Sequence, residues 1–307
     1  MGKKNFLSLP VKFFTALFLI TLIAGCGSNK QKGTGEDFSL DSSEISQDLL
    51  DDIDDAKQIF YSLPSPLETA MLIKSAGATY NEELLNPVSN ASNYTTNKMK
   101  ALNLGIYTTD LSFASLFDQT QTSIEYMNAA KVMADGLGIL DAIDNSTIER
   151  LEENINNRDM IMDIISETFM SSSSFLTEND RPALASIVLV GGWIEGLYIA
   201  TSLVENPDIN ENKLVQRIVD QKLSFEIVIK LLEDNKDNPD VSSLMNQIAD
   251  LKETFDKITI KSTPIKVVPD EESNITILQS ESTIEITPEI FEELVDRVRV
   301  LRQNFIS

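Results

Sequence analysis

The sequence predicts a mainly α-helical protein, built as a multi-helix array or bundle around one central apolar helix, with a small β element near the C-terminus. The central helix is expected at 183–204, ALASIVLVGGWIEGLYIATSLV, which is apolar on nearly every face and contains one charged residue, Glu195. A helix that is hydrophobic all round must be enclosed by other helices or by lipid. Helical spacing of apolar residues recurs through the chain from residue 45, and short alternating β-branched runs appear only after Ile258.

The first helices are short and are separated by clear breaks. Apolar residues at helical spacing predict a helix over 45–60, which Pro64 ends. A second helix is expected over 67–74 and stops at Gly77. A loop rich in Asn and Ser follows at 86–93.

Four more helices are expected before the central one. Apolar residues at helical spacing predict helices at 94–117 and at 123–134. A capping box of Ser146 and Glu149 predicts the start of the next helix, and isoleucines at helical spacing predict the fourth at 158–170. The serine run at 171–174 predicts a loop, and Pro182 suits the first turn of the central helix.

The C-terminal part changes character. Pro207 ends the central helix, and helices are expected over 214–232 and 241–258. The runs ITIKSTPIKVVP, NITIL and STIEIT after Ile258 alternate in the manner of strands, which predicts a β element of two or three strands. A last helix begins at Thr287-Pro288 and runs to about Phe305.

Composition excludes several kinds of chemistry. The 307 residues contain no histidine and one cysteine, Cys26, and the net charge is −23. The commonest general base and metal ligand are therefore absent, and neither a disulfide nor a zinc–thiolate site is expected. A surface this acidic repels nucleic acid, so nucleic acid is not expected as a partner.

The N-terminus carries a targeting pattern. Lys3, Lys4 and Lys12 precede an apolar run over 13–24, and the run ends in Ile-Ala-Gly followed by Cys26. This order resembles the signal and lipobox of bacterial lipoproteins, in which the cysteine is acylated, for instance with palmitate, and becomes the first residue of the mature chain. The resemblance implies attachment to a membrane of the cell envelope through Cys26. The alternative is an ordinary secretory signal that contains a cysteine.

The residue after the cysteine bears on which membrane is meant. Gly27 stands where some bacteria place an aspartate that retains lipoproteins in the inner membrane, so the resemblance implies the outer membrane. The expected organisation has three parts: a signal peptide at 1–25, the lipidated cysteine with a flexible polar tether at 26–44, and one mainly helical domain at 45–307. Within the domain, the region 258–307 contains the β element and the final helix.

The central helix also holds the candidate ligand site. The Glu195 carboxylate lies beside a glycine surface and could bind a cation or a ligand amine. Alternatively, Glu195 lies on a solvent-facing edge of the helix or forms an ion pair with Arg181 or Arg217. Asp110 could likewise have either a binding or a structural role. The ligand-binding candidates are Glu195, Gly191, Gly192, Trp193, Tyr198 and Asp110.

The small residues of this helix support two interpretations. Ala185, Gly192, Gly196 and Ala200 share one face, which allows another helix to approach closely. In lipid the same stripe would be a dimer face, but Glu195 near mid-span disfavours a membrane crossing. We therefore expect a helix buried inside a helical domain.

Three functions remain open. The first is a non-enzymatic, membrane-anchored envelope protein that binds an envelope protein partner or has a structural role. The second is a small-molecule or cation-binding lipoprotein with its site near Glu195. The third, least favoured, is a hydrolase that uses two carboxylates. No metal site can be named, because the EF-hand-like stretch from Asp208 has Lys213 where glycine is needed and Val219 where glutamate is needed. No cofactor and no catalytic residue can be named from the sequence either.

Overall fold

The computed structural model describes residues 66–140, 145–154, 157–205, 212–262, 266–270, 275–279 and 282–307. These residues belong to one compact unit, Asp51–Ser307. The predicted signal peptide, Cys26, the tether and the helix expected over 45–60 lie outside the described residues.

The described chain is mainly helical, which confirms the predicted fold class. Two short 3-10 helices, η1 (Glu82–Leu84) and η2 (Val88–Asn93), occupy the loop region before the first long helix. The α-helices are α2 (Pro66–Ser75), α3 (Asn97–Leu116), α4 (Thr120–Leu137), α5 (Asn145–Glu153), α6 (Arg158–Glu178), α7 (Pro182–Ser202), α8 (Lys213–Glu233), α9 (Pro239–Asp256) and α10 (Pro288–Ile306).

Local sequence explains where these helices begin. Side-chain oxygens of short polar residues accept hydrogen bonds from backbone N–H groups of the first turn, which have no partner within the helix. The capping residues are Thr96, Asn157, Asn212, Asn238 and Thr287. Proline follows in the first turn of α7, α9 and α10, where its fixed φ suits the helix.

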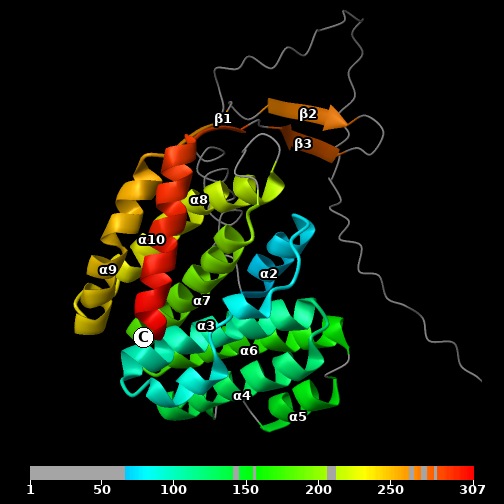
Figure 1. Ribbon diagram of the computed structural model, residues 1–307, viewed down its shortest axis with the longest axis vertical. Helices are drawn as coiled ribbons and strands as arrows, with labels where there is room; N and C mark the ends of the chain where they lie inside the picture. The colour runs from blue at the N-terminus through cyan, green and yellow to red at the C-terminus, as the bar shows by residue number, and fades with distance from the viewer. Residues whose placement is uncertain are drawn as a thin grey trace, which may run out of the picture. The chain divides into compact units, whose positions relative to one another are not determined.

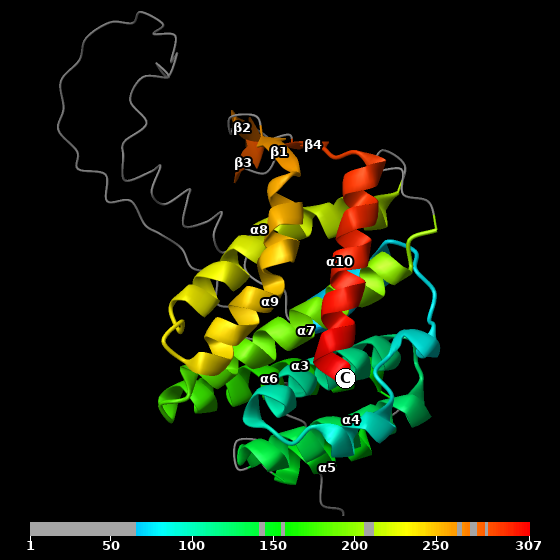
Figure 2. The same cartoon turned by 60° about the vertical axis from the view of Figure 1, so that its left-hand side comes forward.

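Helices α3 and α7 form the centre of the unit. They pack on one another more extensively than any other pair of described elements; α4 packs on α3, α6 on both, α8 and α10 on α7, and α9 on α8 and α10. Both views show α9 and α10 side by side, with the last turn of α10 reaching α3 (Figures 1 and 2). The predicted central apolar helix is therefore enclosed by protein.

Glycines permit the close approach of α3 and α7. A Cβ atom added to Gly191 would lie 2.1 Å from the carbonyl oxygen of Leu102, and one added to Gly105 would lie 2.0 Å from that of Val188. Backbone atoms cannot move aside as a flexible side chain can. Two members of the predicted small-residue face also lie against neighbouring helices, since a Cβ on Gly192 would lie 3.2 Å from the Thr109 hydroxyl of α3 and one on Gly196 would lie 2.3 Å from Thr69 of α2.

Helix α7 has the length and composition of a membrane span. Among the described residues it is the one helix that meets both criteria, yet 78% of its most apolar window is buried inside the protein. The core helix of a soluble domain meets the same criteria, so this likeness is weak support for a crossing.

Two details differ from the sequence prediction. The serine run 171–174 is helical, and α6 continues through it to Glu178. Serine costs little in a helix, and Leu176 beyond the run is 1% exposed, so burial of the next apolar residue extends the helix. The β element has four short strands rather than two or three, with β1 (Thr259–Ser262) antiparallel to β4 (Ser282–Glu285) and β2 (Lys266–Asp270) antiparallel to β3 (Ile275–Gln279).

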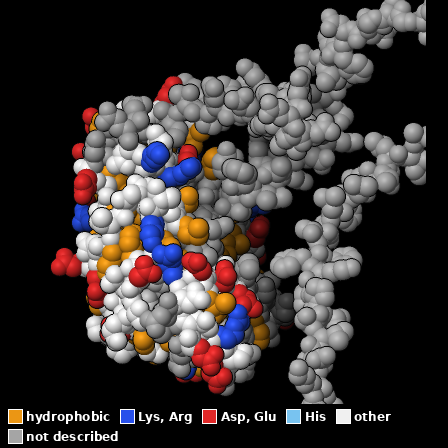
Figure 3. All heavy atoms as spheres, turned by 90° about the vertical axis from the view of Figure 1, so that its right-hand side faces the viewer, with side chains coloured by type: hydrophobic (Ala, Val, Ile, Leu, Met, Phe, Trp, Pro, Cys, Tyr) orange, Lys and Arg blue, Asp and Glu red, His pale blue; other side chains and the backbone are white. Residues whose placement is uncertain are grey.

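The surface mixes charges of both signs. On the face drawn in Figure 3, basic side chains are interspersed with acidic and hydrophobic ones. The net charge of −23 is therefore not spread over this face as one uninterrupted acidic field.

Candidate functional site

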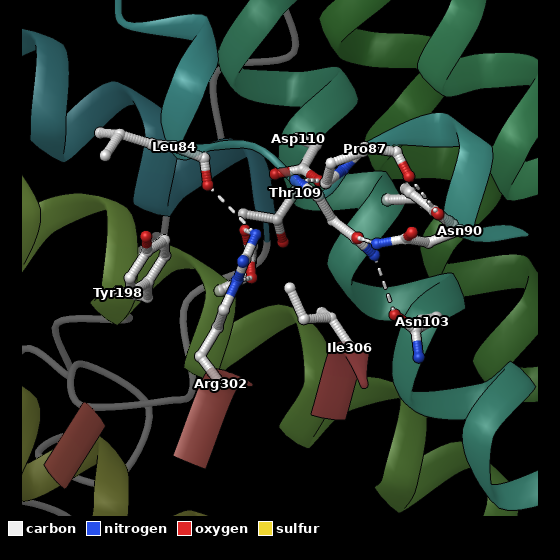
Figure 4. Close-up of polar contacts among 12 residues, drawn as sticks. Leu84, Pro87, Asn90, Asn103, Thr109, Asp110, Tyr198, Arg302 and Ile306 are labelled. Atoms are coloured by element: carbon white, nitrogen blue, oxygen red, sulfur yellow. Dashed lines mark hydrogen bonds and ion pairs between the residues drawn. The ribbon is translucent and has the colours of Figure 1, made fainter. Parts of the chain in front are cut away.

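Glu195 lies in the interior and is paired with Arg302. Its side chain is fully buried, and Arg302 donates from Nε to Oε2 and from Nη2 to Oε1, both at 2.9 Å. The guanidinium also donates to the carbonyl oxygen of Leu84 at 3.1 Å and lies 4.5 Å from the centre of the Tyr198 ring. Figure 4 shows Arg302 reaching from α10 with Tyr198 on one side and Asp110 on the other. Such fork-to-fork pairing fixes both partners in orientation.

A second carboxyl group shares this interior position. Asp110 is fully buried beside Glu195, and one of its oxygens accepts a hydrogen bond from the backbone N–H of Asn86 at 3.1 Å. The other oxygen, Oδ1, has no hydrogen-bond donor among the described residues. Burial, and then the neighbouring Glu195 carboxylate, raise the pKa of Asp110 well above its ordinary value. We infer that Asp110 holds a proton, because one guanidinium cannot neutralise two ionised carboxylates.

The Arg302 guanidinium remains charged in this environment. Burial lowers its pKa, but the Glu195 carboxylate and its hydrogen bonds raise the pKa further than burial lowers it. The cluster of Asp110, Glu195 and Arg302 is therefore neutral as a whole when Asp110 is protonated. A neutral, hydrogen-bonded group of charges can be retained in a protein interior.

Polar side chains next to this cluster hold the end of α10. Asn103 donates to the carbonyl oxygen of Phe305 at 2.9 Å, and the Tyr94 hydroxyl donates to that of Ile306 at 3.3 Å. Asn86 donates to both Asn103 and the Tyr94 hydroxyl at 3.0 Å. The last carbonyl groups of a helix lack partners within it, so these residues supply the capping that α10 needs.

Replacing Asp110 by asparagine tests the protonation of this cluster. A folded-state pKa above the unfolded value means that the folded protein keeps a proton that the unfolded chain loses. The contribution of Asp110 to the free energy of unfolding is then largest below the unfolded pKa of about 4 and falls as pH rises towards the folded pKa. The asparagine side chain would imitate the protonated carboxyl, so this fall should disappear and the variant should be at least as stable as the parent at pH 7. Urea unfolding from pH 4 to pH 8 measures it.

The control for this measurement is Asp135→Asn, which removes an exposed carboxylate from α4. It should leave the slope of stability against pH as it is in the parent. Equal slopes for Asp110→Asn and the parent would show that Asp110 is ionised in the folded protein, contrary to our inference.

The predicted site residues separate into two groups. Glu195, Asp110 and Tyr198 come together around Arg302. Trp193 does not join them, because residues two apart on a helix point in nearly opposite directions. Its ring stacks on Phe225 at 5.4 Å between centroids and its Nε1 donates to Gln221 at 3.0 Å.

The glycines are likewise not beside an open surface. Gly191 and Gly192 face α3, whose backbone and Thr109 side chain occupy the space next to them. Both oxygens of Glu195 are engaged by Arg302. The arrangement therefore does not support a ligand amine or cation at this place.

Sequence reasoning missed Arg302 and named Arg181 or Arg217 as the possible partner of Glu195. Arg181 instead donates to the carbonyl oxygen of Leu137 at 2.8 Å, and Arg217 pairs with Asp220 at 3.3 Å. One signal was present, because Arg302 falls within the apolar stripe of the final helix. The buried members of that stripe are Phe291, Leu294, Val298, Leu301, Phe305 and Ile306.

A different part of the unit offers space for a ligand. A recess with a volume of about 70 Å³, partly open to solvent, lies among α3, α4, α5, α6 and α7. Its walls are mostly apolar, as those of ligand pockets commonly are, but its volume is below the roughly 300–1,000 Å³ of such pockets, so it suits a small apolar group. The residues that line it include Leu104, Leu111, Met127, Ala130, Ile165, Phe169 and Val188. None of the residues predicted from sequence lines it.

Comparison with known proteins adds no assignment. No protein-family model matches this chain, and neither a curated protein nor a solved structure is significantly similar to it.

Proposed function

We propose that this protein is a lipid-anchored, non-enzymatic protein of the bacterial cell envelope, and that its helical domain binds an apolar small molecule in the recess among α3–α7. The recess is the single observation that carries the binding role. The lipobox-like sequence that ends at Cys26 supports the anchor and, with Gly27, an outer-membrane location.

The apolar walls support binding of a molecule with little polarity. The hydroxyls of Thr108 and Thr168 line the recess but donate to their own helices, to the carbonyl oxygens of Leu104 and Ile164. They therefore do not require a polar partner from a ligand. A molecule that covers the walls gains free energy in proportion to the apolar area it removes from water.

A non-enzymatic role is supported by what the interior carboxyl groups do. Glu195 and Asp110 are held by Arg302, Asn86 and each other. The sequence also contains no histidine, and its one cysteine is the proposed lipidation residue. The third function, a hydrolase that uses two carboxylates, is not supported by Glu195 and Asp110, because Arg302 already binds both oxygens of Glu195.

The recess can be tested by filling it. The full-length protein would be extracted from its own envelope in polymer nanodiscs, without detergent, and the small molecules it retains would be quantified by mass spectrometry. Ala130→Phe places a ring at the recess and should reduce the retained molecule by at least tenfold, which is about 1.4 kcal/mol of lost affinity. Val132→Phe is the matched control, because Val132 lies on the same helix and is 52% exposed.

Three results would decide the proposal. Equal retention by Ala130→Phe and Val132→Phe would reject the recess as the binding site. A stoichiometric envelope protein recovered in place of a small molecule would favour the interaction role that the sequence leaves open. The anchor is tested in the same preparation, since Cys26→Ser should abolish incorporation of labelled palmitate.

A further inference from the structure

Strand β3 has an outer edge whose composition does not protect it from pairing. Among the described strands β3 pairs with β2 alone, and no described helix packs extensively on either strand. Charged residues and proline are common means by which a strand edge is kept from pairing. β3, whose residues are Ile-Thr-Ile-Leu-Gln, contains neither. Such residues in the other three strands are Lys261 in β1, Lys266, Pro269 and Asp270 in β2, and Glu285 in β4.

The position of Pro269 indicates which backbone groups face the outer edge of β3. Pro269 lies opposite Thr276, and a proline in a sheet is tolerated where its nitrogen points away from the partner strand. This pair is therefore a non-hydrogen-bonded one. Antiparallel pairs alternate between the two kinds, so the pair of Val267 and Leu278 is also non-hydrogen-bonded. The N–H and C=O groups of Thr276 and Leu278 thus point to the outer edge of β3.

We propose that β3 is the docking edge for a second copy of this chain, whose own β3 adds antiparallel to it across a two-fold axis at Ile277. In this register Thr276 lies opposite the partner's Leu278, and Leu278 lies opposite the partner's Thr276. The outward N–H and C=O groups of both residues then gain hydrogen-bond partners. The two copies use the same surface, as a closed dimer with two-fold symmetry requires.

The charge of the chain favours β3 as the place where two copies meet. Two chains that each carry a net charge of −23 repel one another, so a contact that brings carboxylates together is costly. The five residues of β3 bring none, because they are uncharged. Uncharged segments of high β-propensity without proline pair readily with identical segments. Pairing would also convert two ribbons of two strands into one sheet of four, which is more stable than either ribbon alone.

The contact between two short strands is small. A stable interface between soluble proteins buries about 1,200–2,000 Å², which is more than two strands of this length can cover. We therefore expect the pairing among copies held on one membrane, where the proposed anchor at Cys26 raises their effective concentration. The need for confinement rests on the proposed function, whereas the register of the pairing does not.

Disulfide crosslinking tests the register. Ile277 would lie opposite the partner's Ile277 with a Cα–Cα distance of about 4.5 Å, which a disulfide can bridge. The full-length Ile277→Cys protein would be oxidised with copper phenanthroline in vesicles made from its own envelope, and the products would be identified by mass spectrometry. The matched control is Val268→Cys, opposite Ile277 on β2. The two cysteines of that control would lie about 14 Å apart, so Ile277→Cys should form disulfide-linked dimers at least about tenfold faster.

A proline at the edge tests the hydrogen bonds of the pairing. Leu278→Pro removes an outward N–H from each copy and leaves the ladder with β2 in place, as Pro269 does on the other strand. Added to Ile277→Cys, it should slow crosslinking about tenfold, which is the value of roughly two lost hydrogen bonds. Val267→Pro, opposite Leu278 on β2, removes an N–H from the other edge of the ribbon and should leave the rate unchanged.

The outcomes separate the pairing from the anchor. Equal rates for Ile277→Cys and Val268→Cys, or no effect of Leu278→Pro, would mean random collision and would reject the paired edge. A disulfide from Ile277→Cys to a different envelope protein would make that protein the occupant and overturn self-pairing. Soluble protein with both Cys26→Ser and Ile277→Cys should crosslink at least about tenfold more slowly than the anchored form. Equal rates for these two forms would keep the edge pairing and remove the role of the anchor.

Discussion

Replacing Arg302 by methionine should lower the free energy of unfolding by about 3–5 kcal/mol, the usual cost of removing one partner from a buried ion pair. Methionine keeps much of the side-chain volume, so the loss comes from the buried Glu195 carboxyl group, which would lose both of its hydrogen bonds and its charged partner. Urea unfolding at pH 7, followed by far-ultraviolet circular dichroism, measures the change.

The matched control is Arg299→Met on the same helix. Arg299 pairs with Asp296 at 2.8 Å, but both side chains are more than 60% exposed, so its loss should cost less than about 1 kcal/mol. The double variant Arg302→Met with Glu195→Gln should recover most of the stability, because no unpaired charge remains. Equal costs for Arg302→Met and Arg299→Met would show that the interior pair contributes no more than a surface pair.

Replacing Gly191 by alanine should also destabilise the protein, by at least about 2 kcal/mol. The new Cβ would lie 2.1 Å from the carbonyl oxygen of Leu102, so α3 and α7 would have to move apart along their whole contact. A contact this close with backbone lies at or beyond the upper end of the usual overpacking cost of about 1–3 kcal/mol. The better helix propensity of alanine returns about 1 kcal/mol at most, which leaves a net loss of at least about 2 kcal/mol. Thermal and urea unfolding of the full chain measure the effect.

Gly136→Ala is the control for helix propensity. A Cβ at Gly136 would meet only the far end of the Lys100 side chain, at 2.9 Å, and that side chain can move. The substitution should be neutral or slightly stabilising. A similar loss for Gly136→Ala and Gly191→Ala would mean that the contact between α3 and α7 is not the cause.

The sequence predicts the helices and the centre of this fold because the signals for both are local. Capping residues such as Asn238 and Thr287 act within one turn, and the apolar surface of 183–204 requires enclosure wherever the helix is placed. The glycines of that segment predict a close helix neighbour, which proves to be α3. The glycines do not identify which helix this neighbour is, because any helix can pack closely against a surface without side chains.

The site was less predictable because its parts come from distant segments. Glu195 and Arg302 lie 107 positions apart in the sequence, and no sequence pattern near either residue identifies the other as its partner. The recess is formed by side chains of five helices, each of which reads from sequence as an ordinary apolar face. Arg302 is the one part of the site that the sequence could have indicated. It is a charged residue within an apolar stripe, so its burial requires an acidic partner in the interior.

Glu195 and Arg302 also make one of the least local contacts of the fold, and closing so long a loop costs entropy before the contact can contribute. While α10 is detached, the carboxyl groups of Glu195 and Asp110 lie at the contact of α3 and α7 with no guanidinium beside them. The interior therefore reaches its full stability only when α10 is docked, and a local opening that releases α10 should also loosen the contact of α3 and α7.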